Sequence, residues 1–159
     1  MGFFIHPKEG EGFELIRDRN KTYLFFFAKP MYEFRLKPST PLMYVDNKGQ
    51  TWEPDLHFKT DEGSTPMTLQ LFFPKDKFLA SYCFHDSALE YGYLWMKQVV
   101  HAPFQKTYLN RFEANDLLEE MVEAEGKLFG GGKWFERKCI HAGVDLGAFW
   151  KYATRRIRK

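Results

Sequence analysis

The sequence has little of what marks secreted, membrane-spanning or nucleic-acid-binding proteins. Its 159 residues include 2 cysteines, too few for a disulfide framework. No hydrophobic run approaches the roughly 20 residues of a membrane-spanning helix. The first residues lack the basic segment and long apolar segment of a signal peptide. A net charge of +2 argues against a dedicated nucleic-acid binder.

Aromatic residues are abundant: 17 Phe, 8 Tyr and 4 Trp make up 18% of the chain. Side chains of this size build a large core in one compact domain, which we expect to span residues 1–159. Some of them could instead form an exposed surface for a protein partner. Tyr91, Tyr93 and Trp95, which have polar neighbours, are candidates for such a surface, although the core is an equal alternative.

The first part of the chain, residues 1–60, has the patterns of short β-strands. Residues 32–36 alternate apolar and polar side chains with a period of two. We also expect strands at residues 13–17, 22–28, 42–45 and 51–53. The turn chemistry of Asp46-Asn47-Lys48-Gly49 predicts a hairpin between the last two strands.

Residues 75–159 are expected to be mainly helical. A helix at about residues 77–91 should end at Gly92, and a second at 112–126 should end with Gly126 as its cap. A third is expected at about 144–156. Because strands come first and helices follow, the sequence predicts an α+β fold, with an N-terminal antiparallel β-meander packed against about three C-terminal helices.

Two polar stretches could carry chemistry. Asp61 and Ser64 follow a strand-like segment, and His85 and Asp86 lie within an apolar helix. Imidazole titrates near neutral pH, and a nearby carboxylate orients it and stabilises its charged form. His85 could therefore act as a general base, with Asp61 or Asp86 as the orienting acid and Ser64 as nucleophile or donor. Alternatively, His85, Asp61 and Asp86 could hold a divalent metal.

A structural interpretation competes with this catalytic one. Asp61 and Ser64, around Gly63, are also ordinary turn and capping residues. A histidine on an apolar helix face is more often a core residue satisfied by one hydrogen bond. In this interpretation the same residues form a buried polar network that stabilises the fold.

The cysteines offer one further alternative. Cys83 and Cys139 are expected to be free thiols. Each precedes a histidine by two positions, in the pairs Cys83/His85 and Cys139/His141, so a zinc site with four ligands is conceivable. On a helix, however, residues two apart point in nearly opposite directions and cannot share a metal.

Four short motifs in this order resemble a small family of tailed-phage and prophage proteins known only as a domain of unknown function. They are Thr-Asp-Glu-Gly-Ser-Thr-Pro at residues 60–66, Ala-Ser-Tyr-Cys-Phe-His-Asp at 80–86, Arg-Phe-Glu-Ala-Asn-Asp at 111–116 and Ala-Phe-Trp-Lys-Tyr-Ala-Thr-Arg at 148–155. The resemblance implies a phage or prophage gene. It also adds Thr60, Arg111 and Asn115 to the candidate site.

The chain departs from the family pattern in two places. Met67 stands where an arginine often follows the proline, and Asn115 stands where the family has an acid. Helical spacing puts Asp116 on the solvated face, whereas Asn115 could reach inward. If the position needs an acid for chemistry, this copy is impaired. If it only makes a hydrogen bond, Asn115 serves equally well.

These observations predict two functions of different classes. The first is a component of the virion or tail, or a host-interaction protein, located in the particle or in the cytoplasm of the bacterial host. Its partners would be virion or tail proteins, or a host protein. The second is a small His/Asp-dependent hydrolase, metal-assisted if a divalent ion is bound, acting on cell-envelope material.

Overall fold

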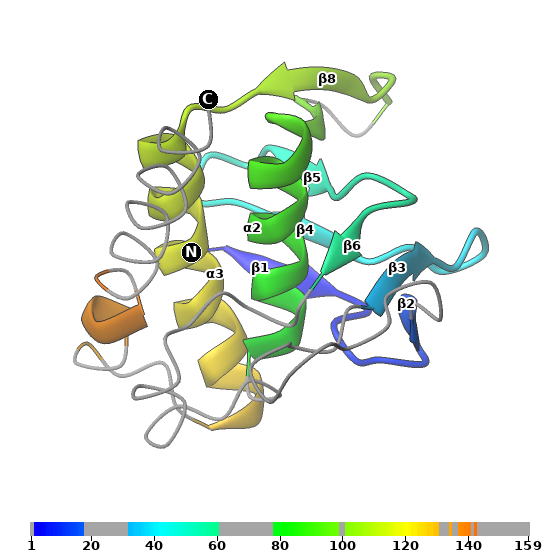
Figure 1. Ribbon diagram of the computed structural model, residues 1–159. Coiled ribbons are helices and arrows are strands. Elements are labelled where there is room, and N and C mark those ends of the chain that lie inside the picture. Colours follow the sequence, from blue (N-terminus) through cyan, green and yellow to red (C-terminus); the bar gives the residue numbers. More distant parts are fainter. Residues whose placement is uncertain are drawn as a thin grey trace, which may run out of the picture.

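The chain folds into two β-sheets packed against two long helices (Figure 1). This computed structural model describes residues 2–17, 32–60, 78–98, 101–130, 134, 137–140 and 142. The predicted α+β class is confirmed. Within the described residues, no helix is long and apolar enough to cross a membrane.

The larger sheet has five strands in the order β1-β4-β5-β7-β8. In chain order they are β1 (Phe3–Ile5), β4 (Met43–Val45), β5 (Thr51–Glu53), β7 (Tyr93–Lys97) and β8 (Gln105–Tyr108). All neighbouring strands are antiparallel. The two strands β7 and β8 come from the part of the chain expected to be mainly helical.

The smaller sheet has the order β2-β3-β6, formed by β2 (Phe13–Arg17), β3 (Tyr32–Leu36) and β6 (Lys59–Thr60). The expected strands at 13–17 and 32–36 are confirmed with their bounds. Residues 18–31, which include the strand expected at 22–28, lie outside the described residues.

Helix α2 (Leu79–Tyr91) ends at Gly92, whose φ of 76° provides the predicted left-handed cap. Helix α3 (Arg111–Phe129) begins with a capping box between Asn110 and Glu113. The predicted end at Gly126 is wrong. The helix continues past this buried glycine and ends at Gly130. The third helix expected at about 144–156 lies outside the described residues.

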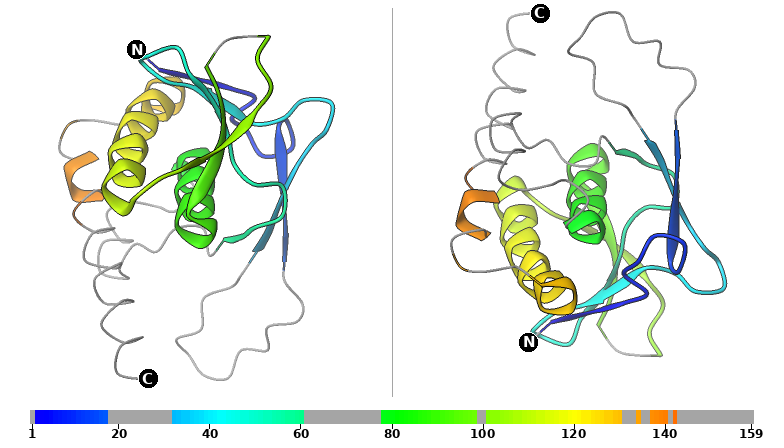
Figure 2. Two further views of the ribbon diagram at one scale, coloured as in Figure 1. Left: turned by 90° about the horizontal axis from the view of Figure 1, so that it is seen from above. Right: turned by 90° about the horizontal axis from the view of Figure 1, so that it is seen from below.

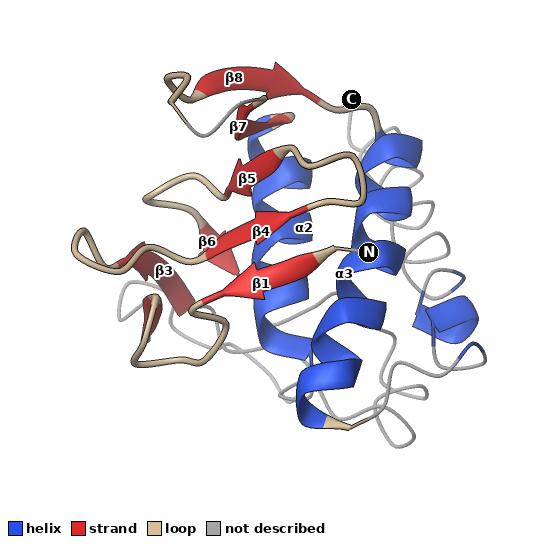
Figure 3. Ribbon diagram, turned by 180° about the vertical axis from the view of Figure 1, so that it is seen from behind, coloured by secondary structure: helices blue, strands red, loops and turns tan. Residues whose placement is uncertain are grey.

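Helix α2 lies at the centre of the molecule, with α3 on one side and the smaller sheet on the other (Figure 2). Side chains of the larger sheet alternate between two environments, as the pleat requires. Phe4, Tyr44, Trp52 and Leu94 are buried and belong to the core. Their sequence neighbours occupy the opposite side, which no described helix covers (Figure 3). We call that side the open face.

Candidate functional site

The structure brings the starts of the two predicted polar motifs together. Thr60 ends β6, and its Oγ1 donates a hydrogen bond of 2.5 Å to Oδ2 of Asp86 on α2. Asp61 and Ser64, which follow Thr60 in the sequence, lie outside the described residues. Their roles remain predictions, and the contact that supports them is the one between Thr60 and Asp86.

His85 joins the two helices. Its Nε2 lies 2.9 Å from Oδ1 of Asn115 on α3, so Nε2 carries the proton when this amide oxygen is the acceptor. Its Nδ1 lies 3.7 Å from Oδ1 of Asp86, beyond hydrogen-bond distance. The prediction that Asn115 reaches inward is confirmed, because this side chain is buried against His85.

These four side chains form a line from Thr60 through Asp86 and His85 to Asn115. Only Asp86 has a measurable opening to solvent, with 11% of its side chain exposed against 2% for His85. A general base has to reach its substrate, so this burial favours the interpretation as a stabilising network. Asp86 is the one member through which an outside molecule could reach the line.

Arg111, the other residue added by the family resemblance, is the first residue of α3 and is partly buried. It lies four positions before Asn115, so both belong to one side of the helix. The acid that follows Asn115, Asp116, is exposed as predicted.

Glu125 is a buried carboxyl group that the sequence reasoning did not identify. Its oxygens accept hydrogen bonds from the backbone N–H of Ala80 and Ser81, at 3.1 and 2.9 Å, and from Oγ of Ser81 at 2.5 Å. Helix α2 has no side-chain cap of its own at Phe78, so Glu125 of α3 provides one. Burial raises the pKa of Glu125 to about 7, although these three hydrogen bonds oppose the shift.

A sequence signal for Glu125 did exist. The apolar stripe of α3 includes Ala114, Leu118 and Met121, and the next position of this stripe is residue 125. A glutamate at a stripe position predicts a buried carboxyl group that needs donors. Which donors it would meet depends on α2, and helical spacing within α3 carries no information about that.

A pocket of about 290 Å³ lies beside the start of β1, lined by Gly2, Asn47, Glu120, Glu123 and Ala124. Both of its acids already have partners. Glu120 accepts hydrogen bonds from the hydroxyl of Tyr44 and the backbone of Asn47. Glu123 pairs with Lys127 and Arg137. The pocket therefore does not present the unpaired carboxylates that a cation site requires.

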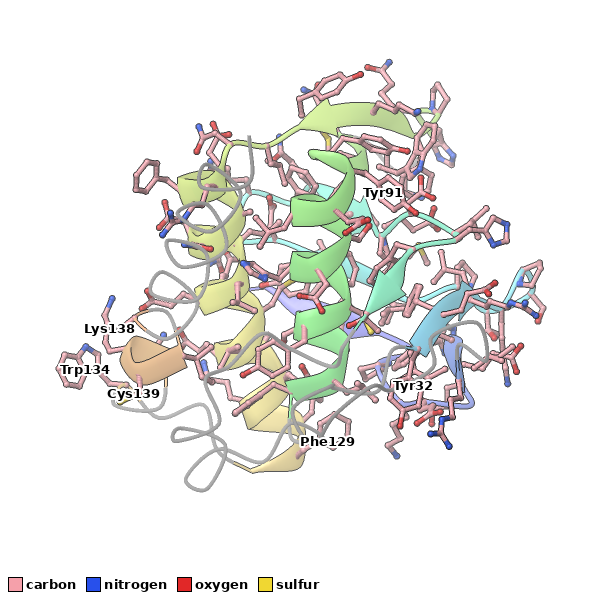
Figure 4. The ribbon with its side chains drawn as sticks, in the orientation of Figure 1. Tyr32, Tyr91, Phe129, Trp134, Lys138 and Cys139 are labelled. Carbon is pink, nitrogen blue, oxygen red and sulfur yellow. The ribbon has the colours of Figure 1, made fainter. Side chains whose placement is uncertain are left out.

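Four aromatic side chains meet at the β7–β8 end of the molecule. We call this group the aromatic corner: Tyr91, Tyr93, Trp95 and Tyr108. The ring centroid of Tyr93 lies 6.0 Å from that of each other member. Tyr91 and Tyr108 are exposed, and Figure 4 shows Tyr91 at the C-terminal end of α2. Tyr93 and Trp95 are partly exposed, so the three aromatic side chains considered in the sequence analysis do not belong to the core.

Asp55 orients two of these aromatic side chains. Its Oδ2 accepts hydrogen bonds from the hydroxyl of Tyr93 at 2.6 Å and from Nε1 of Trp95 at 3.2 Å. Burial raises the pKa of Asp55, but the hydrogen bonds from Tyr93, the backbone of His57 and Trp95 outweigh burial and lower it overall. The carboxylate is thus ionised at neutral pH.

The β1–β4 end of the open face is apolar. The register places Phe3 opposite Val45 and Ile5 opposite Met43. Phe3 is 54% exposed, and the other three are partly buried by their neighbours. On the open face the polar side chains of β5, Thr51 and Glu53, lie between this apolar end and the aromatic corner.

The described residues offer no metal site. No group of three or more His, Cys, Asp or Glu side chains among them could hold an ion. Cys83 is buried in α2 and Cys139 is partly exposed, and neither is in a disulfide. His141, which the zinc hypothesis requires, lies outside the described residues, as does Asp61.

Comparisons of the chain with protein-family models, with curated proteins and with solved structures find no match.

Proposed function

We propose that this protein is a non-enzymatic interaction component encoded by a tailed phage or prophage, associated with the virion or tail or directed at a host protein. The open face of the five-stranded sheet is the observation that carries the proposal. It combines apolar side chains at β1 and β4 with the aromatic corner at β7 and β8. Interface cores are enriched in aromatic residues, which contribute large contact area at low cost in conformational entropy.

The burial of the polar line supports a binding role over catalysis. His85 and Asn115 satisfy each other inside the α2–α3 contact. Such a pair stabilises one arrangement of two helices without needing a substrate. The phage origin is supported by the order of the four sequence motifs.

The proposal is tested on particles purified from the phage or induced prophage that encodes the chain. Quantitative mass spectrometry should find the protein in the particles or in a stable complex with one host protein. A second preparation should carry the variant Phe3→Asp, which puts a charge on the open face without touching the core. We expect the variant to fold normally, by circular dichroism, and to lose the association. Equal incorporation of the variant and the wild type would contradict a role for this face.

A hydrolase is the second candidate, and the Thr60–Asp86 hydrogen bond favours it. This contact places the start of the motif that contains Asp61 and Ser64 beside the His85-Asp86 motif. Among the described residues of this site, Asp86 would then be the acid that a substrate can reach, with His85 next to it. Cell-envelope material is the substrate class that a phage enzyme would meet.

The test of this candidate is the variant Asp86→Asn, assayed on purified cell-envelope material with and without added divalent metal. Asp86→Asn keeps the shape of the side chain and an acceptor for Thr60. If the protein is a hydrolase, activity should fall by about 10²-fold or more while the fold is retained. Absence of activity in the wild type, under all metal conditions, would leave the interaction role as the better proposal.

A further inference from the structure

We propose that Tyr93 and Trp95 form a binding site for a quaternary ammonium group, of the kind that choline carries, and that Lys106 fills this site in the free protein. The inference deepens the proposed interaction role by naming the chemistry that one corner of the open face recognises. It rests on that role only for its biological setting, because the binding itself can be measured on the purified chain.

The two rings form a corner with a cation already in it. Their planes are 85° apart, with the ring centroids 6.0 Å from each other. Nζ of Lys106 lies 4.3 Å from the centroid of Tyr93 and 5.3 Å from that of Trp95. Both distances are within the roughly 6 Å range over which a ring face attracts a cation. The ammonium group of Lys106 thus marks where an outside cation would lie.

The corner is held in place before any ligand arrives. Asp55 accepts hydrogen bonds from the polar ends of both rings, which fixes their orientation. The same carboxylate adds negative charge beside the rings, where it also attracts Lys106, and its lowered pKa keeps that charge at neutral pH. Rings oriented in advance lose little conformational entropy when a ligand binds.

The two ring faces of the corner suit a quaternary ammonium group. The hydroxyl of Tyr93 and the indole N–H of Trp95 donate their protons to Asp55. Lys106 lies over the faces of both rings and also within hydrogen-bond reach of the Tyr93 oxygen. Ring faces attract charge without requiring an N–H donor, and aromatic sites of this kind recognise choline and methylated ammonium groups. A quaternary ammonium has no N–H groups whose hydrogen bonds to water would be lost.

Lys106 is able to leave the corner. It is exposed, and it belongs to β8, whose one partner strand among the described residues is β7. Its register partner across the sheet is Trp95, so its side chain reaches the corner from the neighbouring strand. An incoming cation would displace this side chain into solvent rather than disturb the core.

The experiment measures choline binding by NMR, following the indole N–H signal of Trp95, which is assigned from its loss in Trp95→Phe. The variant Lys106→Gln removes the internal cation. We expect it to bind choline about tenfold more tightly than the wild type does. The neutral isostere 3,3-dimethyl-1-butanol has the same shape without the charge and should bind about tenfold more weakly than choline.

The matched control is Lys97→Gln. Lys97 lies over a different ring, that of Phe104, at 4.8 Å, so its loss should leave choline binding at the wild-type value. If Lys106→Gln binds choline no better than it binds the neutral isostere, the proposal is wrong. The choline titration and the particle-association experiment are independent measurements. Failure of the choline site would therefore not count against the interaction role, and failure of the interaction role would not count against the choline site.

Two further arms distinguish the sources of the ligand. Vesicles of phosphatidylcholine are compared with vesicles of phosphatidylglycerol, using Lys106→Gln. If the variant is retained on phosphatidylcholine vesicles but not on phosphatidylglycerol vesicles, the site is supported and its ligand is a lipid headgroup. Binding of free choline without retention supports it with a soluble or polymer-borne choline. Absence of both responses overturns the proposal.

Discussion

His85 on α2 and Asn115 on α3 meet in the contact between the two helices, with Nε2 and Oδ1 2.9 Å apart. Both side chains are almost completely buried. Because the amide is neutral, Asn115 provides Nε2 of His85 with a hydrogen-bond partner without burying a carboxylate. Asn115 thus makes a structural hydrogen bond at a position where the sequence resemblance implies an acid.

The first prediction concerns this pair. Asn115→Ala leaves Nε2 of His85 buried without its acceptor, so the free energy of unfolding should fall by about 1–3 kcal/mol. Urea unfolding followed by circular dichroism measures the change. The control is Glu90→Ala at an exposed position of α2, which should shift stability by no more than about 0.5 kcal/mol. Equal effects of the two substitutions would refute a stabilising role for the pair.

The second prediction concerns the pH dependence of stability through Glu125. Its pKa is raised from 4.5 to about 7 in the folded chain. Between these values the folded chain holds a proton that the unfolded chain has released. Raising the pH through this window therefore lowers the free energy of unfolding, by at most about 1.4 kcal/mol per pH unit from this group.

Urea unfolding of the wild type and of Glu125→Gln, at several pH values from 4.5 to 8, tests this sign. The variant keeps an acceptor for α2 but has no proton to exchange, so the difference between the two profiles isolates Glu125. The gap should favour the wild type most at low pH and shrink as the pH rises. Parallel profiles would show that Glu125 titrates normally.

Much of the local structure could be predicted because it depends on nearby residues. The period-two pattern of residues 32–36 identified β3, and Gly92 identified the end of α2. The inward placement of Asn115 followed from its position beside the apolar stripe of α3. Each of these inferences uses spacing within one element, which the sequence carries directly.

The parts that escaped prediction depend on contacts between distant residues. Strand β7 pairs with β5 across the whole of α2, and its run Tyr-Leu-Trp-Met-Lys has no clear period. Gly126 reads as a stop signal, yet α3 continues through it as a buried residue in the interior of the helix. The donors that meet Glu125 belong to another helix. These three features depend on contacts with other segments, so the residue spacing within one segment does not predict them.

The third prediction concerns the start of α3. Oδ1 of Asn110 accepts hydrogen bonds from the backbone N–H of Phe112 and Glu113, and Glu113 accepts one in return from the backbone of Asn110. Asn110→Ala removes the side-chain half of this box and should cost about 1 kcal/mol. Thermal unfolding measures the loss, and Asn110→Asp should retain most of the stability. If Asn110→Ala leaves the thermal stability unchanged, solvent replaces the side chain as the cap of this helix end.

The last prediction concerns the hairpin between β4 and β5. Asp46 accepts hydrogen bonds from the backbone of Lys48 and Gln50 through Oδ1 and from the indole of buried Trp52 through Oδ2. Asp46→Ala removes all three at once and leaves the indole N–H buried without an acceptor, so we expect a loss of about 2–4 kcal/mol.

Asn47→Ala is the control for this hairpin. The exposed side chain of Asn47 belongs to the same turn, and the contact it makes with Glu120 comes from its backbone, which alanine retains. It should change stability by about 0.5 kcal/mol or less. Urea unfolding followed by tryptophan fluorescence compares the two variants, because Trp52 reports directly on the environment that Asp46 provides. If both variants unfold at the same urea concentration, the turn is held by its backbone conformation and not by the Asp46 carboxylate.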